Sequence, residues 1–388
     1  GGNDYVGAYN INEEFSTITL EDFGAGETDG DYVEFEVEDT VFTGDADEMT
    51  VVLDNFGAAP VKVPPSTLDD DVLDGEENNI DGEYGYLEID NENDDDGVIE
   101  VFNIVSTGDN DRGNFLKIAD GTDVATTLNI TGTTDLNLNF TDGGTAYVLE
   151  TVDASGLDAD LWLRGLDSDA DLITITGAQG DNDIAAGDAL ANNITTFDGN
   201  DIIRAGQADE STIDAGNGDN EIHASYTGDL DVTTGDGNDV IHAKDVDSAV
   251  IDAGAGDDLV IATTMAGGDS IDGGEGTDTL TIGYNNDGTY YNRAVAATAA
   301  ADEDFADQFQ NFEIIKLCSL RDGTVDMAYL QDIQHVALGD NAYSATLQGL
   351  SDGATLDFER DNAGFDVTVE LTETAGDESF NVSLASSA

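Results

Sequence analysis

Short segments in which apolar and polar residues alternate occur along most of the chain. Residues 1–120 contain STITLEDF, DYVEFEVEDTVF, MTVVLDNF, GYLEID and GVIEVFNIV, and residues 121–176 contain ATTLNIT, DLNLNF, AYVLETVDAS, DLWLRG and DLITITG. Residues 284–388 contain FEIIKL, HVALG, ATLDF, DVTVEL and SFNVSL. Alternation with a period of two places every second side chain on one face of a strand. The turn-forming residues between these segments indicate many short strands, and therefore an all-β fold.

One segment has a different pattern. Residues 294–310 read AVAATAAADEDFADQFQ, which is rich in alanine, the strongest helix former. Phe305 and Phe309 are four residues apart, so they lie on one face of a helix. We therefore predict one short helix here.

Residues 177–283 repeat a nine-residue motif. Its copies are GAQGDNDIA, TFDGNDIIR, AGNGDNEIH, TGDGNDVIH, AGAGDDLVI and GGEGTDTLT, which begin at residues 177, 196, 215, 234, 253 and 273. Four of the five intervals are 19 residues and the last is 20. A fixed period of this length is typical of a solenoid in which each repeat forms one turn. We predict a parallel β-roll, or β-solenoid, with 19-residue turns and β-rich flanking domains.

Three columns of apolar residues follow the same period. The first two are Ile184, Ile203, Ile222, Ile241, Val260, Leu280 and, two residues further on, Ala186, Ala205, Ala224, Ala243, Ala262, Ile282. The third is Ile194, Ile213, Val232, Ile251, Ile271. Stacked turns place equivalent residues about 4.8 Å apart. We therefore expect Ile ladders that face each other across a thin core.

The turns of the repeat combine glycine with oxygen-bearing side chains. Glycine adopts positive φ without a Cβ clash, which turns backbone carbonyl groups inward. The sixth position of each motif supplies Asp or Asn. Ca²⁺ takes six to eight oxygen ligands from carboxylates and carbonyls, and two stacked turns can supply that number. The predicted calcium ligands are Gly180, Asn182, Gly199, Asp201, Gly218, Asn220, Gly237, Asp239, Gly256, Asp258, Gly276 and Asp278.

The composition agrees with cation binding. The 388 residues include 86 acidic and 10 basic side chains, for a net charge of −76. Such a charge destabilises a compact state unless cations neutralise it, and it disfavours nucleic acids and anionic membranes as partners. Hydrophobic residues still make up 39% of the chain, so it is not a disordered acidic tail. No apolar run is long enough for a transmembrane helix, and the single cysteine allows no internal disulfide.

The nonapeptides resemble the G-G-x-G-x-D-x-U-x repeats of RTX (repeats-in-toxin) proteins, in which U is a large apolar residue. The resemblance covers six copies, about a quarter of the chain, and implies a parallel β-roll with calcium in its turns. RTX rolls usually show the motif twice per turn, whereas it occurs once per turn here. The opposite turns, GQADES, SYTGDL and KDVDSA, are irregular, so we expect one row of ions. Asn182 and Asn220 lack the charge of Asp, which weakens the expected sites beside them.

The regions around the repeat refine the resemblance. TTLNITGTTDLNLNF and LETVDASGLDADLWLRG precede it, and GGEGTDTLTIG and FADQFQNFEIIKL follow. This arrangement is similar to bacterial surface-layer (S-layer) proteins, which implies type I secretion and calcium-dependent self-assembly at the cell surface. The implied partners are copies of the chain and cell-surface polysaccharide. The predicted parts are an acidic β-rich region (1–120), solenoid turns (121–176), the calcium roll (177–283) and a C-terminal β-rich region with the helix (284–388).

Three acidic clusters outside the repeat are either further calcium sites or solvated turns. They are Asp22, Asp29 and Asp31; Glu92, Asp94 and Asp96; and Asp167, Asp169 and Asp171. The second partly matches an EF-hand loop, but it ends in Asn103 in place of the bidentate Glu and has no flanking helices.

Two histidines occupy equivalent positions on neighbouring turns. His223 and His242 are 19 residues apart, so their rings are expected to lie about 5 Å apart. They form either a transition-metal site or a pair of stacked surface side chains.

The chain contains no motif of a known catalytic site, such as H-E-x-x-H, G-x-S-x-G or a Walker A sequence. We therefore predict no enzyme activity. The leading hypothesis is a structural protein of an extracellular surface layer or filament. The alternatives are a segment of a large secreted RTX adhesin and, less favoured, the non-catalytic C-terminal roll of a secreted hydrolase.

Overall fold

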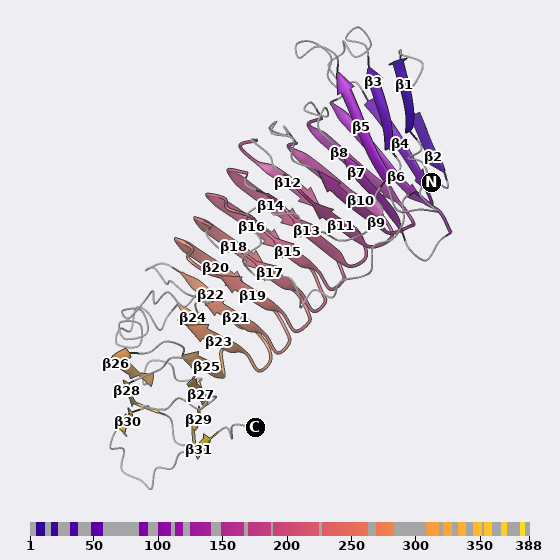
Figure 1. The fold of residues 1–388 in the computed structure, drawn as a ribbon. Coiled ribbons are helices and arrows are strands. Elements are labelled where there is room, and N and C mark those ends of the chain that lie inside the picture. The colour runs from indigo at the N-terminus through magenta and orange to yellow at the C-terminus, as the bar shows by residue number, and fades with distance from the viewer. Residues whose placement is uncertain are drawn as a thin grey trace. The chain divides into compact units, whose positions relative to one another are not determined.

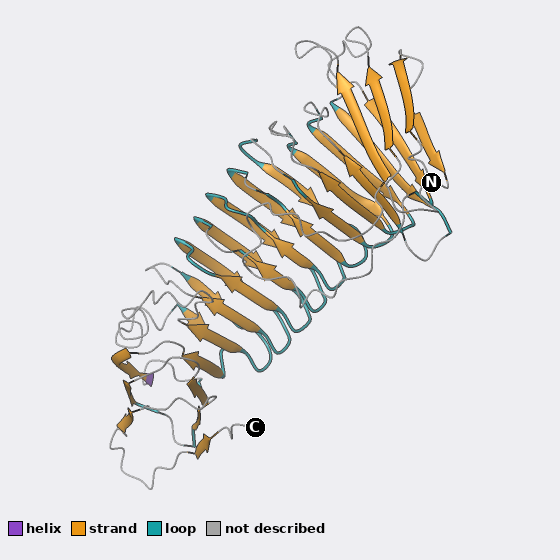
Figure 2. Ribbon diagram, in the orientation of Figure 1, coloured by secondary structure: helices purple, strands orange, loops and turns teal. Residues whose placement is uncertain are grey.

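The computed structural model describes residues 5–11, 17–21, 32–37, 48–56, 85–91, 100–109, 113–118, 125–140, 149–166, 170–187, 189–224, 227–262, 269–282, 308–317, 321–327, 333–338, 344–350, 353–358, 366–370 and 381–384. The chain divides into two compact units, Gly1–Ala208 and Asp209–Ala388. The described part is almost entirely strand and turn, with essentially no helix (Figure 2). It also contains no helix long and apolar enough to cross a membrane.

Unit 1 is a parallel β-solenoid whose strands alternate between two sheets (Figure 1). The first sheet contains, in order, β1 (Tyr5–Ile11), β3 (Tyr32–Val37), β5 (Gly85–Asn91), β7 (Asn114–Ile118), β9 (Leu136–Phe140), β11 (Leu161–Arg164), β13 (Asn182–Ala185) and β15 (Ile202–Arg204). The second contains β2 (Thr17–Glu21), β4 (Glu48–Asp54), β6 (Val101–Thr107), β8 (Thr127–Gly132), β10 (Thr151–Leu157), β12 (Ile173–Thr176) and β14 (Ala191–Thr195). The acidic N-terminal region thus forms turns of the same kind as those that follow it.

Unit 2 is also a parallel β-solenoid. Its first sheet contains β17 (Glu221–His223), β19 (Val240–Ala243), β21 (Leu259–Ala262), β23 (Thr279–Ile282), β25 (Ile314–Leu317), β27 (His335–Leu338), β29 (Thr355–Phe358) and β31 (Asn381–Leu384). The second contains β16 (Glu210–Asp214), β18 (Asp229–Thr233), β20 (Ser248–Asp252), β22 (Ser270–Asp272) and β24 (Phe309–Gln310). A third sheet contains β26 (Arg321–Asp326), β28 (Ser344–Gln348) and β30 (Asp366–Glu370).

The predicted helix is wrong where it can be tested. Residues 294–307 lie outside the described residues, but Phe309 and Gln310 form β24, which pairs in parallel with β22. Phe309 is 8% exposed and extends the apolar column of the second sheet beyond Ile271. Burial of this ring in the core favours a strand over a helix at Phe309 and Gln310.

The length of a turn is 19 residues only within the repeat. Register pairs Glu221 with Val240 and Val240 with Leu259, whereas it pairs Val101 with Thr127. Turns outside the repeat are therefore longer. The average over the whole solenoid is about 21 residues per turn. Parallel pairing tolerates this variation because extra residues can be placed in the turns, where they leave the strand register unchanged.

The predicted apolar columns form the core. In unit 2, Ile222, Ile241, Val260 and Leu280 are fully buried, as are Ile184 and Ile203 in unit 1. The alanine column and the column from Ile194 to Ile271 are at most 2% exposed. Each turn therefore contributes one or two large apolar side chains per strand, so apolar burial per turn is small.

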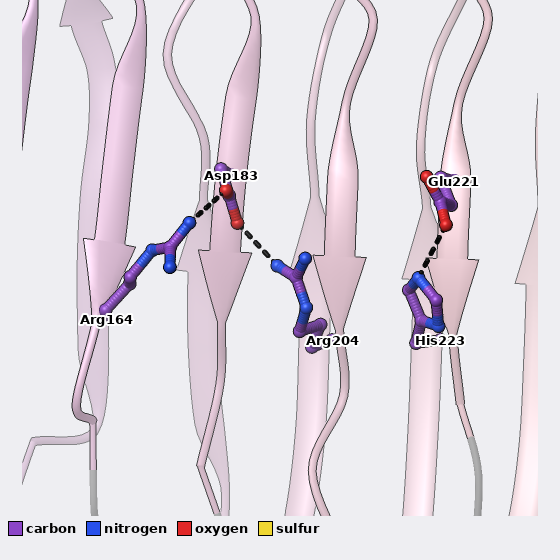
Figure 3. Close-up of polar contacts among 5 residues, drawn as sticks. All are labelled: Arg164, Asp183, Arg204, Glu221 and His223. Atoms are coloured by element: carbon purple, nitrogen blue, oxygen red, sulfur yellow. Dashed lines mark hydrogen bonds and ion pairs between the residues drawn. The ribbon is translucent and has the colours of Figure 1, made fainter. Parts of the chain in front are cut away.

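A charged contact lies on the outer face of the first sheet of unit 1 (Figure 3). Asp183 of β13 accepts hydrogen bonds from Arg164 of β11 and from Arg204 of β15, the latter over 2.5 Å. The three side chains come from three successive strands, and Asp183 is only 6% exposed. Two of the few basic residues thus neutralise one nearly buried carboxylate.

Candidate cation-binding turns

The sixth-position side chains of the motif are buried. Each is either the first residue of a strand of the first sheet or the residue directly before such a strand. Their exposed fractions do not exceed 2%, although four of the six are acids: Asn182, Asp201, Asn220, Asp239, Asp258 and Asp278. Acidic side chains are rarely fully buried unless a partner compensates them. The contacts of these carboxylates therefore determine what the turns can bind.

Glycine makes this burial possible by letting the stacked turns approach closely. Gly237, Gly256 and Gly276 have φ angles of 143°, 152° and 151°, and Gly199 and Gly218 also have positive φ. A Cβ at Gly256 would lie 1.8 Å from the carbonyl oxygen of Gly237 in the preceding turn. Gly180 does not have positive φ, contrary to the prediction. Its small size still matters, because a Cβ there would lie 2.8 Å from the backbone carbonyl group of Ala159.

One oxygen of each buried carboxylate accepts a backbone hydrogen bond from the preceding turn. In unit 2, Asp239 Oδ1 accepts from the Asn220 amide over 2.8 Å, and Asp258 Oδ1 accepts from the Asp239 amide over 2.7 Å. Asp278 Oδ1 accepts from the Asp258 amide over 2.8 Å. In unit 1, Asp201 Oδ1 accepts from the Asn182 amide over 2.7 Å. The same carboxylate position is thus used in successive turns.

Glu313 extends this row, and the sequence analysis missed it. Its Oε2 accepts a hydrogen bond from the Asp278 amide over 2.8 Å, and the register pairs the following residue, Ile314, with Thr279. Asp278 and Glu313 are 35 residues apart. The long insertion between them breaks the 19-residue period, so spacing alone could not identify Glu313.

The second oxygen of the carboxylate lacks a partner in three of these turns. Oδ2 of Asp239, Asp258 and Asp278 is inaccessible to solvent and has no hydrogen-bond partner among the described residues. An ionised carboxylate in this position needs a proton or a cation, because burial of an uncompensated charge costs several kcal/mol.

In two turns the buried side chain is an asparagine, which carries no charge and can donate hydrogen bonds. Asn182 Nδ2 donates hydrogen bonds to the carbonyl oxygen of Gly180 over 2.9 Å and to Asp201 Oδ1 over 2.9 Å. Asn220 Nδ2 donates to the carbonyl oxygen of Gly218 over 3.0 Å. The amide group therefore supplies positive hydrogens to oxygens of the glycine turn. An ionised aspartate has no hydrogen to supply, so the aspartate turns present oxygens alone.

Burial also shifts the titration of these carboxyl groups. It raises the pKa of Asp258 to about 7 and that of Asp278 to about 6, and neighbouring acids, including Asp257 for both, add to the effect. The pKa values of Asp201 and Asp239 are raised as well, again chiefly by burial. In the absence of a cation, folding therefore raises the pH at which these carboxyl groups ionise above the value of about 4 that is typical of an unfolded chain.

This shift predicts how stability depends on pH in the presence of a chelator. The folded state binds more protons than the unfolded state above about pH 4, so the unfolding free energy should fall from about pH 4 to about pH 7. We expect the melting temperature in EGTA to decrease over this range, and excess Ca²⁺ to reduce the decrease. Scanning calorimetry of the wild type and of a D258N/D278N variant measures it. An equally steep decrease in both proteins would contradict the assignment to these two groups.

A second row of side-chain oxygens lies on the exposed side of the same turns. Asp219 Oδ1 accepts from the Asn238 amide, Asn238 Oδ1 from the Asp257 amide and Asp257 Oδ1 from the Thr277 amide, over 2.8 to 3.0 Å. Asp and Asn are interchangeable here, because both accept with Oδ1. This row connects the turns without requiring a charge.

The buried row ends at Asn182 on the N-terminal side. The register pairs Asn182 with Leu161 and Leu161 with Leu136, and both leucines are fully buried. An apolar side chain thus occupies the place of the carboxylate in these turns, and they provide no cation ligand at that position.

The opposite edge of the repeat has no equivalent row in its described part. It is closed by small or apolar side chains, such as Ala189 and Ala208 in unit 1 and Val246 in unit 2. Asp269 is a buried acid on this edge, and its Oδ1 accepts a hydrogen bond from the Ala249 amide over 2.9 Å. The turns at this edge, whose sequence is irregular, are thus filled mainly by small or apolar side chains and not by a row of carboxylates.

The structure tests the other candidate sites only in part. Asp22, Asp29, Asp31, Glu92, Asp94, Asp96, Asp167 and Asp169 lie outside the described residues. Asp171 is described and exposed, two residues before β12. The geometry therefore assigns no role to these three clusters.

The comparisons with known proteins identify no relative. The chain matches no protein-family model, no curated protein sequence and no solved structure. The fold and the chemistry of the turns are therefore the basis for any functional conclusion.

Proposed function

We propose that the chain is a calcium-dependent structural protein that self-assembles outside the cell, in a surface layer or filament. The observation that supports this most is the row of buried carboxylates in stacked turns, each with one oxygen bonded and the other without a partner at Asp239, Asp258 and Asp278. This donor set fits Ca²⁺, which prefers carboxylate and carbonyl oxygens and tolerates variable geometry. Asp239, Asp258 and Asp278 would hold the ions, together with carbonyl groups of the glycine turns.

A bound cation would supply the charge that these turns lack. Ions that bind only the folded chain add their binding free energy to its stability. With a net charge of −76 and a thin core, the chain gains more from neutralisation than a typical globular protein. Dissociation constants of about 10⁻⁴–10⁻³ M, typical of extracellular calcium modules, suffice at extracellular calcium levels.

This mechanism accounts for export and assembly together. In a cytosol with little free calcium, repulsion keeps the chain extended and competent for secretion. Outside the cell, calcium folds the turns and reduces the repulsion between copies of the chain, which then associate. No catalytic role is part of the proposal.

The test of the proposed function is assembly of the purified chain. We expect Ca²⁺ added to a chelated sample to give particles that scatter light and that appear as regular sheets or filaments in electron micrographs, whereas Mg²⁺ does not. Mg²⁺ is a suitable control because it has the same charge but prefers rigid octahedral coordination. Folding on calcium addition without ordered particles would contradict the assembly function and favour a spacer in an adhesin.

A further inference from the structure

A second cluster of possible metal ligands lies on the outer face of the first sheet of unit 2. Glu221 and His223 are the first and last residues of β17, and His242 lies on the neighbouring strand β19. The register pairs His223 with His242 and Ile222 with Ile241. Because both isoleucines are fully buried in the core, the alternating residues Glu221, His223 and His242 point outward.

The three side chains are close together. The rings of His223 and His242 stack with their centroids 4.6 Å apart and their planes within 10° of parallel. His223 Nε2 lies 2.9 Å from Glu221 Oε1, a contact that Figure 3 marks with a dashed line. One ligand atom from each residue lies within 4.8 Å of the other two. In the part of the chain that is described, this is the only such group of three metal-ligand side chains.

The donor set differs in kind from that of the cation-binding turns. Two imidazole nitrogens and one carboxylate suit Zn²⁺, Cu²⁺ and Ni²⁺, whereas Ca²⁺ is bound by oxygen ligands. Calcium in the surrounding medium therefore does not compete effectively for the histidines. The strongly negative chain also raises the local concentration of any divalent cation.

The geometry requires only small side-chain movements. With Zn–N distances of about 2.0–2.1 Å, tetrahedral ligand atoms lie roughly 3.4 Å apart. The ligand atoms of the three residues are at most about 1.4 Å further apart than this. Rotation of the two imidazole rings out of their stacked arrangement can bring the atoms closer by that amount. The side chain of Glu221 is 41% exposed, so an ion can enter from solvent. The three residues leave at least one coordination position for water.

We propose that Glu221, His223 and His242 form a surface site for a transition-metal ion of the Zn²⁺ or Cu²⁺ class. The site is separate from the buried carboxylate row and does not depend on the proposed function. An ion here cross-links two successive turns through their side chains, in addition to the backbone ladder.

The test uses Zn²⁺ and the calcium-saturated full chain at a concentration below that at which particles form, so that the chain is folded but not assembled. The chain contains only three histidines, which makes their imidazole NMR signals a simple readout. We expect one equivalent of Zn²⁺ to shift the signals of His223 and His242 and to leave that of His335 in place. Isothermal titration calorimetry should show that H223Q and H242Q each weaken this binding by about tenfold or more.

His335 provides the matched control. It contacts a carboxylate, Asp357, over 2.5 Å, but the register places it beside Ile314 and Thr355, not beside a second histidine. H335Q should therefore leave zinc affinity unchanged. The proposal is overturned if all three signals shift together, or if H223Q and H242Q bind zinc as the wild type does, because carboxylates then account for the binding. Circular dichroism of each variant checks that the fold is retained.

Discussion

Replacement of Gly256 by alanine should destabilise the folded chain by at least about 3 kcal/mol. Gly256 has a φ of 152°, and a Cβ would lie 1.8 Å from the carbonyl oxygen of Gly237. That oxygen belongs to the stacked backbone and cannot move without separation of two turns. Equilibrium denaturation in excess Ca²⁺ measures the change in unfolding free energy.

Gly353 is the matched control for this substitution. It also has positive φ, at 84°, but a Cβ there would meet nothing within 4 Å. Gly353→Ala should therefore cost only the conformational strain, about 1–2 kcal/mol. If both variants lose the same stability, the close approach of the turns at Gly256 does not constrain the fold.

Replacement of Asp258 by asparagine should stabilise the chain in chelator and weaken its response to calcium. Asparagine already occupies the equivalent position at 182 and 220, where its amide donates to the carbonyl oxygens of Gly180 and Gly218. At 258 it would retain the Oδ1 acceptor for the Asp239 amide and remove a buried carboxyl group whose Oδ2 has no partner. We expect a rise in melting temperature of a few degrees in EGTA and one calcium ion fewer per chain.

Asp257→Asn is the control that shows whether the changes in stability and calcium binding at Asp258→Asn come merely from the loss of one negative charge. It removes one negative charge at the adjacent, exposed residue, and asparagine can still accept from the Thr277 amide, as Asn238 does from the Asp257 amide. It should change neither the calcium count nor the stability in EGTA by more than a small amount. Equal behaviour of the 257 and 258 variants would contradict a specific role for the buried carboxylate.

The core of the repeat could be predicted from the sequence because its period has almost no interruptions. Residues 19 apart, such as Ile222 and Ile241, occupy the same place on successive turns, so spacing alone identifies the column. Where insertions break the period the prediction failed. Glu313 and Phe309 continue the columns of unit 2, yet a long segment separates both from the last repeat.

The chemistry of the turns was only partly predictable. The sequence identifies an oxygen at each sixth position, but not that these side chains are buried and bonded to the amide of the preceding turn. It also indicates that Asn220 lacks a charge, but not that its amide hydrogens bond to Gly218. Such contacts depend on how adjacent turns stack in three dimensions, which residue identity does not determine. The sequence analysis also missed strands β1 and β7.

The central claim is that cations complete the aspartate turns, and far-UV circular dichroism during calcium titration tests it most directly. At pH near 7.5, above the raised pKa values of Asp258 and Asp278, a chelated sample should show a weaker β signal than the calcium-saturated chain. Added Ca²⁺ should restore that signal cooperatively, because each ion stabilises the stacking of neighbouring turns. A chain that already has its full β signal in chelator at this pH, and the same stability with or without calcium, would contradict the account.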